Sequence, residues 1–220
     1  MKVLTVNVGR PRPNPWKGIS ATGIDKQPVE GPVAVTAPGP KGDGAVGLAG
    51  DRVYDVKHHG GTDQAVYAYA REDLDGWEAE LGRELPNGSF GENLTTLGMD
   101  LNSALIGERW RIGSDVVLEV AVPRIPCVTF QGWLEQEGWL KRFTQAAVPG
   151  PYLRVIEPGE ISAGDPVEIV HRPDHDVTVA LTFRAFTLEP ELLPRLLVAD
   201  ALPEEDREMV RRRTADRSQG

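Results

Sequence analysis

The sequence contains a single cysteine, no long apolar run and fewer basic than acidic residues, and each of these shortages excludes a class of protein. One cysteine cannot form an internal disulfide, which predicts a protein of a reducing compartment. No apolar segment is long enough to cross a bilayer, and Met1–Val8 is too short and too interrupted for the core of a signal peptide. We therefore expect a soluble, cytoplasmic protein with no membrane partner.

Basic side chains are outnumbered, because 24 Lys and Arg face 33 Asp and Glu and leave a formal charge of −9. This charge disfavours binding to the phosphate backbone of a nucleic acid, so we expect no nucleic-acid partner. An anionic small molecule would have to be captured locally, by backbone amides or by a few placed arginines.

Glycine and proline, by contrast, are abundant, with 24 and 18 residues. This composition is typical of many short strands joined by tight turns. A helical pattern interrupts the strand signals from Ala65 to Gly82, and amphipathic helical pieces follow between Phe130 and Phe143. The prolines of Gly9–Pro15 predict an irregular loop. The predicted fold is mainly β (α+β), a distorted β-barrel core with helical insertions. The clearest predicted strands are Val3–Val8, Pro32–Thr36, Val116–Val122, Pro151–Ile156 and Val167–Val170.

The composition changes near His171–Asp174, where strand signals stop and helical ones begin. We predict a barrel domain over residues 1–172 and a small C-terminal three-helix domain over residues 173–220, with its last few residues disordered. Asp176 is the predicted cap of the first helix, and Pro203 with the acids that follow it marks the start of the third. Such short helices must dock on each other or on the barrel.

The lone cysteine, Cys127, follows a strand-like run and lies in the segment Pro123–Cys127. Prolines at both ends of this segment predict a stiff, non-helical corner, because proline has no N–H for a strand ladder. Arg124 is close by, and a neighbouring cation favours the thiolate, which binds metals and attacks electrophiles. The alternative is a small buried side chain with a packing role only.

Two other segments are rich in polar groups and glycine. In the first, His58 and His59 precede Gly60 and Gly61, whose amides can form an anion-binding concavity with histidine donors nearby. The alternatives are a hairpin turn with surface histidines, or a zinc site, for which the ligand spacing is missing.

The second segment, Asn87–Thr96, presents Glu92 and Asn93 after a glycine. A carboxylate beside an amide offers acceptors and donors to a heterocycle with N–H and C=O edges. An Asx-type turn that caps its own backbone is the alternative.

In their order along the chain, these segments resemble the MOSC family, the domain named for the C-terminal part of molybdenum-cofactor sulfurases, and most of all its YiiM-like branch. The resemblance covers nearly the whole chain, including the helical C-terminal part. It departs at Val53, where the family commonly has glutamine. The matching motifs are Gly50-Asp51…Asp55…His58-His59-Gly60-Gly61…Asp63, Gly88…Phe90-Gly91-Glu92-Asn93-Leu94-Thr95, Ile106-Gly107…Gly113, Pro123-Arg124…Pro126-Cys127 and Tyr152-Leu153-Arg154-Val155…Gly159…Ile161…Gly164-Asp165.

The resemblance implies a site for the molybdenum cofactor (molybdopterin) centred on Cys127 as metal ligand, with Arg124 keeping the thiol ionised. A soft thiolate suits a molybdenum centre that carries other sulfur ligands. It further implies an oxidoreductase that removes oxygen from small N-hydroxylated substrates, such as N-hydroxylated bases or amidoximes. No flavin, iron–sulfur or nicotinamide motif is visible, so a separate electron-donor protein is expected. The residues expected to bind the cofactor are His58, His59, Gly60, Gly61, Asp63, Glu92, Asn93 and Thr95.

Two alternatives to the reductase use the same residues. In the first, Cys127 carries a persulfide and the protein is a sulfur carrier without stable metal. In the second, the pocket holds a cofactor or other ligand without catalysis, and the C-terminal helices dock a partner.

Overall fold

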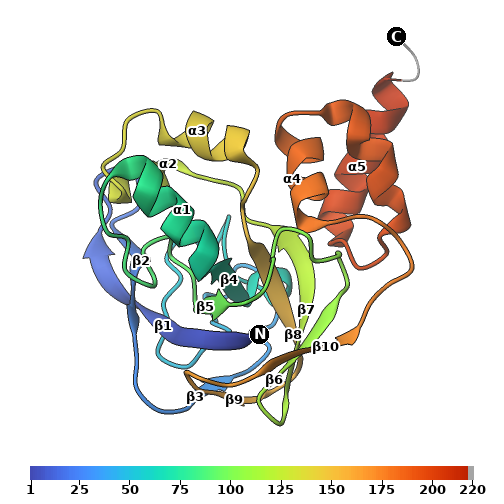
Figure 1. The fold of residues 1–220 in the computed structure, drawn as a ribbon. Helices are drawn as coiled ribbons and strands as arrows, with labels where there is room; N and C mark the ends of the chain where they lie inside the picture. The colour runs from blue at the N-terminus through green and yellow to red at the C-terminus, as the bar shows by residue number, and fades with distance from the viewer. Residues whose placement is uncertain (218–220) are drawn as a thin grey trace.

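A computed structural model describes residues 1–217 of the chain, and a mixed sheet of eight strands forms its centre (Figure 1). The strand order is β10-β6-β7-β8-β4-β5-β1-β2, and a small second sheet pairs β3 with β9. All neighbours are antiparallel except β4 and β5, which are parallel because α1 (Arg71–Leu81) lies between them in the chain. The strands are β1 (Lys2–Pro13), β2 (Ala21–Pro28), β3 (Val33–Val35), β4 (Val66–Ala70), β5 (Leu94–Leu97), β6 (Arg109–Ile112), β7 (Val116–Pro123), β8 (Pro151–Glu157), β9 (Gly159–Ile161) and β10 (Val167–His171).

The sheet curls back on itself without a continuous ladder. The N–H of Val3 donates to the carbonyl of Asp165 at 2.9 Å, and the N–H of Gly164 donates to the carbonyl of Val3 at 2.8 Å. These bonds connect the start of β1 to the turn before β10. Strands β10 and β1, the first and seventh in the sheet order, therefore meet at one end only. The predicted mainly β, α+β fold with a distorted barrel is confirmed in this open form.

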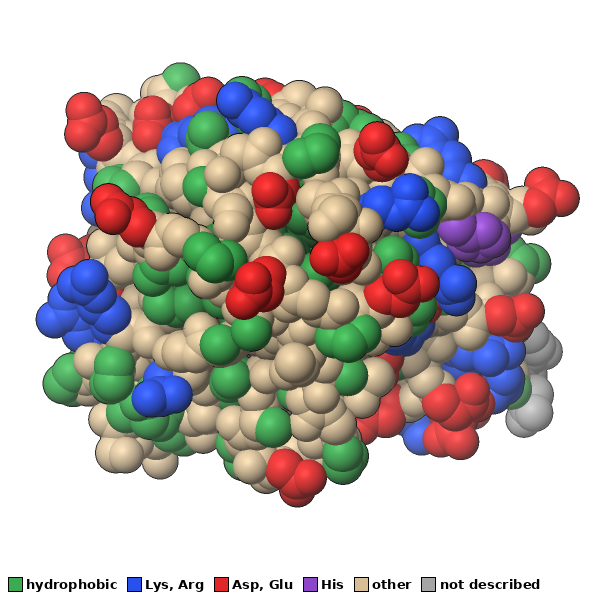
Figure 2. Space-filling view, turned by 90° about the horizontal axis from the view of Figure 1, so that it is seen from below, with side chains coloured by type: hydrophobic (Ala, Val, Ile, Leu, Met, Phe, Trp, Pro, Cys, Tyr) green, Lys and Arg blue, Asp and Glu red, His purple; other side chains and the backbone are tan. Residues whose placement is uncertain are grey.

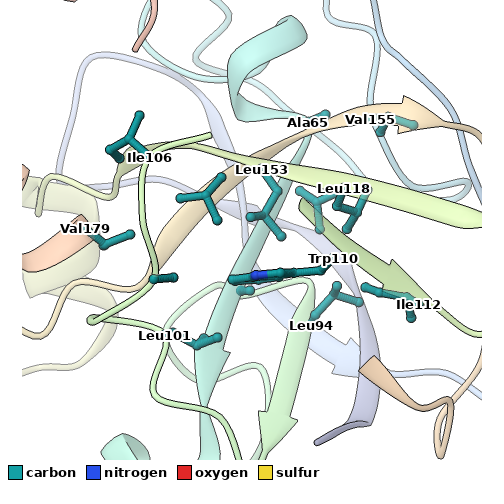
Figure 3. Packing of buried hydrophobic residues seen from close by; sticks show 14 of the residues in the cluster. Ala65, Leu94, Leu101, Ile106, Trp110, Ile112, Leu118, Leu153, Val155 and Val179 are labelled. Carbon is teal, nitrogen blue, oxygen red and sulfur yellow. The ribbon is translucent and has the colours of Figure 1, made fainter. Parts of the chain in front are cut away.

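The barrel interior is packed around Trp110 of β6 (Figure 3). Its indole is buried among aliphatic side chains from several strands, and its Nε1–H donates to Glu108 Oε1 at 2.7 Å. All eight residues of β7 are buried, which explains why its side chains are apolar except for Glu119, a residue that pairs with Arg109 and Arg154. Burial of each large apolar side chain stabilises the fold by about 1.5–3 kcal/mol. Figure 3 labels the neighbours Leu94, Leu101, Ile112, Leu118 and Leu153.

A second, aromatic cluster fills the space between the sheet and three helices, α1, α2 (Val128–Trp133) and α3 (Trp139–Ala146), which gather on one side in Figure 1. Its rings meet mostly edge to face, as at Phe130 and Trp139, whose centroids lie 5.5 Å apart. Trp77 of α1 donates its Nε1–H to Tyr69 Oη at 2.9 Å. The other large members are Phe90, Phe143 and Phe183.

Two local predictions are wrong for identifiable reasons. The segment Val66–Ala70 forms β4 instead of the first turns of a helix, because it is buried on every side and therefore lacks the alternation that marks a half-buried strand. Strand β1 continues through Pro13, although Gly9–Pro15 was expected to be an irregular loop. From Asn7 onward β1 pairs with β2 alone, so the missing proline N–H groups leave no ladder bond unmade on the other edge.

The C-terminal segment folds into α4 (Val179–Thr187), the 3₁₀ helix η2 (Pro190–Val198) and α5 (Glu204–Arg217). Thr178 caps α4 through a bond from the N–H of Leu181 at 3.0 Å, so the predicted cap at Asp176 is wrong. Apolar side chains of all three pieces join the core cluster of the barrel. The domain boundary at residue 172 stays a prediction, and the predicted disordered end falls on residues 218–220, outside the described range.

Charged side chains of both signs are scattered over the face shown in Figure 2, between apolar and uncharged ones. Among residues 1–217, no helix combines the length and the apolar character that a bilayer crossing requires.

Candidate functional site

A cavity opens beside the C-terminal end of β7. Its empty volume, including the part open to solvent, is about 920 Å³. Its walls come from β2, the loop of residues 45–60, the start of β4, the turn before β5 and residues 124–129, with Tyr152 from β8. Segments far apart in the sequence therefore meet here.

Cys127 lies on this wall, at the corner that its prolines predict. Its backbone is extended, with φ −132° and ψ 166°, and its carbonyl accepts the N–H of Gln131 at 3.1 Å in the first turn of α2. The side chain is partly buried and packs against the aromatic cluster while it lines the cavity. The thiol is thus held between an apolar support and the open space.

Arg124 is the most unusual group of the cavity, because it is a buried cation. Only 5% of the residue is exposed, and its guanidinium carbon lies 3.8 Å from the ring centroid of Phe130 and 5.7 Å from that of Tyr67. Within residues 1–217, Nη1 has no hydrogen-bond partner. A cation–π contact offsets part of the desolvation of the charge, but it leaves the N–H donors free.

A buried ion pair forms another part of the wall. Lys26 Nζ lies 2.6 and 2.7 Å from the two carboxylate oxygens of Asp51. Burial alone would raise the pKa of Asp51, but the Lys26 ammonium together with bonds from Asn93 and from the N–H of Gly9 lowers it below its ordinary value. Asn93 also accepts the N–H of Tyr67 at 3.1 Å, so its side chain is fixed on both sides. This wall is therefore rigid and already internally paired.

The two neighbouring histidines have different environments. His59 lines the cavity, and burial, followed by the positive charge of Arg124, lowers its pKa to about 4. It is therefore a neutral imidazole near pH 7, able to donate one hydrogen bond and accept another. His58 has a side chain that is 52% exposed, and its Nδ1 lies 2.8 Å from Asp55 Oδ1. Asp55 also pairs with Lys17 at 2.5 Å.

Gly60 and Gly61 both have φ near +80°, a conformation that favours glycine. Gly60 lines the cavity, with its Cα hydrogens facing the side chain of Val53. At Gly61 a Cβ would lie 2.8 Å from backbone atoms of Lys41, so a larger residue would displace that neighbouring loop. Both glycines are thus required by the backbone path at the edge of the cavity.

A model of the MOSC domain matches residues 55–168, which include the His58–Gly61 segment, Cys127 and the strands β4 to β8 of the main sheet. The chain belongs to the MOSC domain family. The Bacillus subtilis protein YflK is 33% identical over 183 residues, which are 83% of this chain and 79% of YflK. A protein of Gibberella moniliformis named "Reductase" is 33% identical over 175 residues, 78% of this chain but 29% of that protein. The crystal structure of YiiM from Geobacillus stearothermophilus aligns with a TM-score of 0.76 at 27% identity, covering 96% of this chain and 98% of that one, so this MOSC protein is YiiM-like.

Some of the predicted site residues support the MOSC cavity from behind its wall. Glu92 is fully buried, and its carboxylate accepts the N–H of Gly88 at 2.5 Å, the N–H of Phe90 at 3.0 Å and the hydroxyl of Thr95 at 2.9 Å. Burial raises the pKa of Glu92, and these bonds oppose the rise. Asp63 binds Arg154 through an ion pair of 2.6 Å. These side chains hold the turns that shape the cavity.

Other contacts of the MOSC cavity could not be predicted from the sequence, although Asp51 and Tyr152 belong to motifs that match the family. Lys26 meets Asp51 across 25 residues of chain, and Asn14 Nδ2 donates to Thr129 Oγ1 at 3.2 Å across 115. Tyr152 lines the cavity, and burial raises its pKa to about 12. Only the folded sheet brings these partners together, so no local pattern could have predicted which residues pair. Val53, at the position where the family commonly has glutamine, gives this part of the wall an apolar surface.

Proposed function

We propose that this protein is a molybdenum-cofactor-dependent reductase that removes oxygen from small N-hydroxylated substrates, with Cys127 as the metal ligand. The observation that carries the proposal is a buried arginine, Arg124, with a free N–H donor beside a partly buried thiol in one cavity. MOSC domains are associated with this cofactor as a family, and one relative is named a reductase.

The donors on the cavity wall suit an anionic heterocycle. A buried cation without a carboxylate partner is costly unless a ligand anion completes it. Arg124 lines the cavity and would hold the anionic group through its guanidinium, and the Gly60 turn would add donors where no side chain intervenes. Neutral His59 and Asn93 lie on the same wall for the edge of the ring system.

The protein offers one soft ligand for a metal and little else. Across residues 1–217, no group of three or more His, Cys, Asp or Glu is arranged to hold a metal ion. A metal bound at Cys127 would therefore take its remaining ligands from a cofactor that brings its own sulfur atoms, which suits molybdopterin. Glu92, Thr95 and Asp63 would act indirectly, by holding the turns on which the binding groups lie.

When bound, the cofactor would supply the two-electron oxygen-transfer chemistry: R–NHOH, two electrons and two protons give R–NH₂ and water. The electrons would come from a separate donor protein. The pKa of Tyr152 is about 12, so its phenol keeps its proton near pH 7 and can donate a hydrogen bond to a bound ligand. His59, with its pKa of about 4, orients a ligand as a neutral imidazole and does not supply a proton as imidazolium.

The test starts from full-length protein isolated from a host that makes the cofactor. We expect bound molybdenum and pterin in the wild type, and reduction of benzamidoxime to benzamidine with a reduced viologen as electron donor. Cys127→Ala should lose the metal and the turnover, whereas Val128→Ala, at the exposed neighbour, should keep both.

Each alternative has its own outcome in the same experiment. Protein without molybdenum or pterin contradicts the proposal, and a mass increase of one sulfur atom on Cys127 would then identify a sulfur carrier. Protein that holds the cofactor but reduces no N-hydroxylated compound would be a binding module.

A further inference from the structure

We propose that Arg154 is a positioning residue for the ligand cavity: it fastens the glycine turn of the cavity wall to the C-terminal helical segment. The turn comprises Gly60, Gly61 and the short 3₁₀ helix η1 (Thr62–Gln64), and Gln64 at its end lines the cavity. The C-terminal segment lines none of the cavity in the described chain, because the lining residues end at Tyr152. Its influence on the cavity would therefore pass through other residues.

The guanidinium of Arg154 contacts three separate parts of the chain. Nε donates to Asp63 Oδ1 at 2.8 Å, and Nη2 lies 2.6 Å from the same oxygen. Nη1 donates to Glu119 Oε1 of β7 at 2.7 Å and to the carbonyl of Ala201 at 2.8 Å. Ala201 belongs to the turn between η2 and α5. One planar group thus joins the glycine turn, the barrel wall and the C-terminal segment.

The bonds of Arg154 are largely buried and directional, so they can fix the position of the glycine turn. Only 14% of the Arg154 side chain is exposed, and it is fixed in the sheet because residues 119 and 154 face each other in the register of β7 and β8. Bonds from a guanidinium to carboxylates are charge-assisted and directional, and a lysine ammonium could not reproduce the fork. Asp63 provides the only carboxylate of the glycine turn, so it is the only side chain of residues 60–64 that can form an ion pair through a carboxylate.

A second set of contacts joins the same two regions. The backbone of Lys41 packs so closely on Gly61 that a Cβ there would lie 2.8 Å away, and Lys41 Nζ lies 3.7 Å from Glu205 Oε2 at the start of α5. Ala201 packs against Gly107, where a Cβ would lie 2.9 Å from the Ala201 side chain. The glycine turn is therefore connected to the start of α5 through Lys41 as well as through Arg154.

The first experiment measures amide hydrogen exchange by mass spectrometry on the full-length, ligand-free protein, and it does not depend on the proposed function. In Arg154→Gln we expect exchange about tenfold faster in residues 60–65 and in residues 199–203, because hydrogen bonds to charged groups are lost. In Asp63→Asn, where only the turn loses its anchor, residues 60–65 alone should exchange faster.

Arg109→Gln is the matched control, because Arg109 also binds Glu119, at 2.7 Å, but no contact joins it to Asp63 or Ala201 among the described bonds. We expect it to leave both regions unchanged. Exchange in residues 60–65 that is unaltered in Arg154→Gln, or accelerated equally in Arg109→Gln, overturns the proposal. Asp63→Asn keeps the proposal testable if Arg154→Gln fails to fold, since the Asp63 side chain is 39% exposed.

The second experiment rests on the proposed function and measures molybdenum and pterin per chain in protein as isolated. Arg154→Gln and Asp63→Asn should both retain several-fold less cofactor than Arg109→Gln, and Arg154→Lys should recover part of the loss. A loosened turn with undiminished cofactor would overturn the positioning role. A wild type without cofactor would instead contradict the proposed function, and the exchange result would still decide whether Arg154 holds the turn.

Discussion

Replacing Arg124 with methionine should stabilise the ligand-free protein and impair ligand binding at the same time. The guanidinium is 5% exposed, and Nη1 lacks a hydrogen-bond partner within the described residues. Its desolvation costs several kcal/mol, whereas the contact with Phe130 at 3.8 Å returns about 2 kcal/mol. Methionine fills a similar space without charge, so the free energy of unfolding should rise by about 1 kcal/mol and Tm by about 2–4 °C.

The same substitution should weaken the binding of an anionic ligand by about 30-fold or more, because truncating one partner of a buried charged contact costs about 2–5 kcal/mol. It should also raise the pKa of His59 from about 4, because the charge of Arg124 is the second cause of the low value after burial. The assays are thermal unfolding of ligand-free protein, cofactor content as isolated, and titration of His59 by NMR.

Arg71→Met provides the control, because only 14% of the Arg71 side chain is exposed but its bonds are made within the chain, to Asp75, Glu78 and the carbonyl of Leu85. It should lower Tm and leave cofactor content unchanged. An Arg124→Met protein that melts lower than the wild type and keeps its cofactor would refute the reasoning, since the arginine would then be a structural group.

Three further predictions concern single side chains. Cys127→Ala should keep the far-UV circular dichroism spectrum of the wild type while losing molybdenum, and a collapsed spectrum would show that the thiol is needed for packing. His59 has a folded-state pKa of about 4 against an ordinary 6.5, so the unfolded chain binds the proton more readily than the folded chain. Relative to His59→Asn, the wild type should therefore lose up to about 3 kcal/mol of stability as the pH falls from about 6.5 to 4, and none above pH 6.5. Urea titrations at several pH values measure this difference. Asp51→Asn should destabilise the protein by about 3 kcal/mol because it leaves the Lys26 ammonium buried and unpaired. Asp55→Asn should cost less than about 1 kcal/mol, because the partners of Asp55 are more exposed. Equal losses of stability in urea unfolding would contradict this difference.

Much of the fold could be predicted because its signals are local. The run Val116–Val122 is apolar except at Glu119 because β7 is buried on both faces, and Gly82 ends α1 in the left-handed conformation that glycine allows. The segment Val66–Ala70 misled the prediction because a fully buried strand has no alternation to distinguish it from a helix. The prolines of β1 misled it because pairing on one edge only cannot be read from composition.

The candidate site also has a part that could be predicted from the sequence and a part that could not. Cys127, Arg124, His59, Gly60 and Asn93 stand out as residue types suited to a ligand, and all of them line the cavity, although their roles remain predictions. The ion pair that forms another part of the wall could not be found, since its partners are far apart in the chain and each is an ordinary residue type. The free donor of Arg124 is likewise a property of three-dimensional packing.

The cavity is closed by bonds between distant parts of the chain. Asn14 meets Thr129 across 115 residues, and Asn7 meets Thr95 across 88. Such long-range contacts form late in folding because the intervening chain must first be ordered. A growing polypeptide cannot assemble the pocket before Tyr152 has left the ribosome. A molecule that occupies the pocket can therefore bind only after the chain from Asn14 to Tyr152 has been synthesised and brought together.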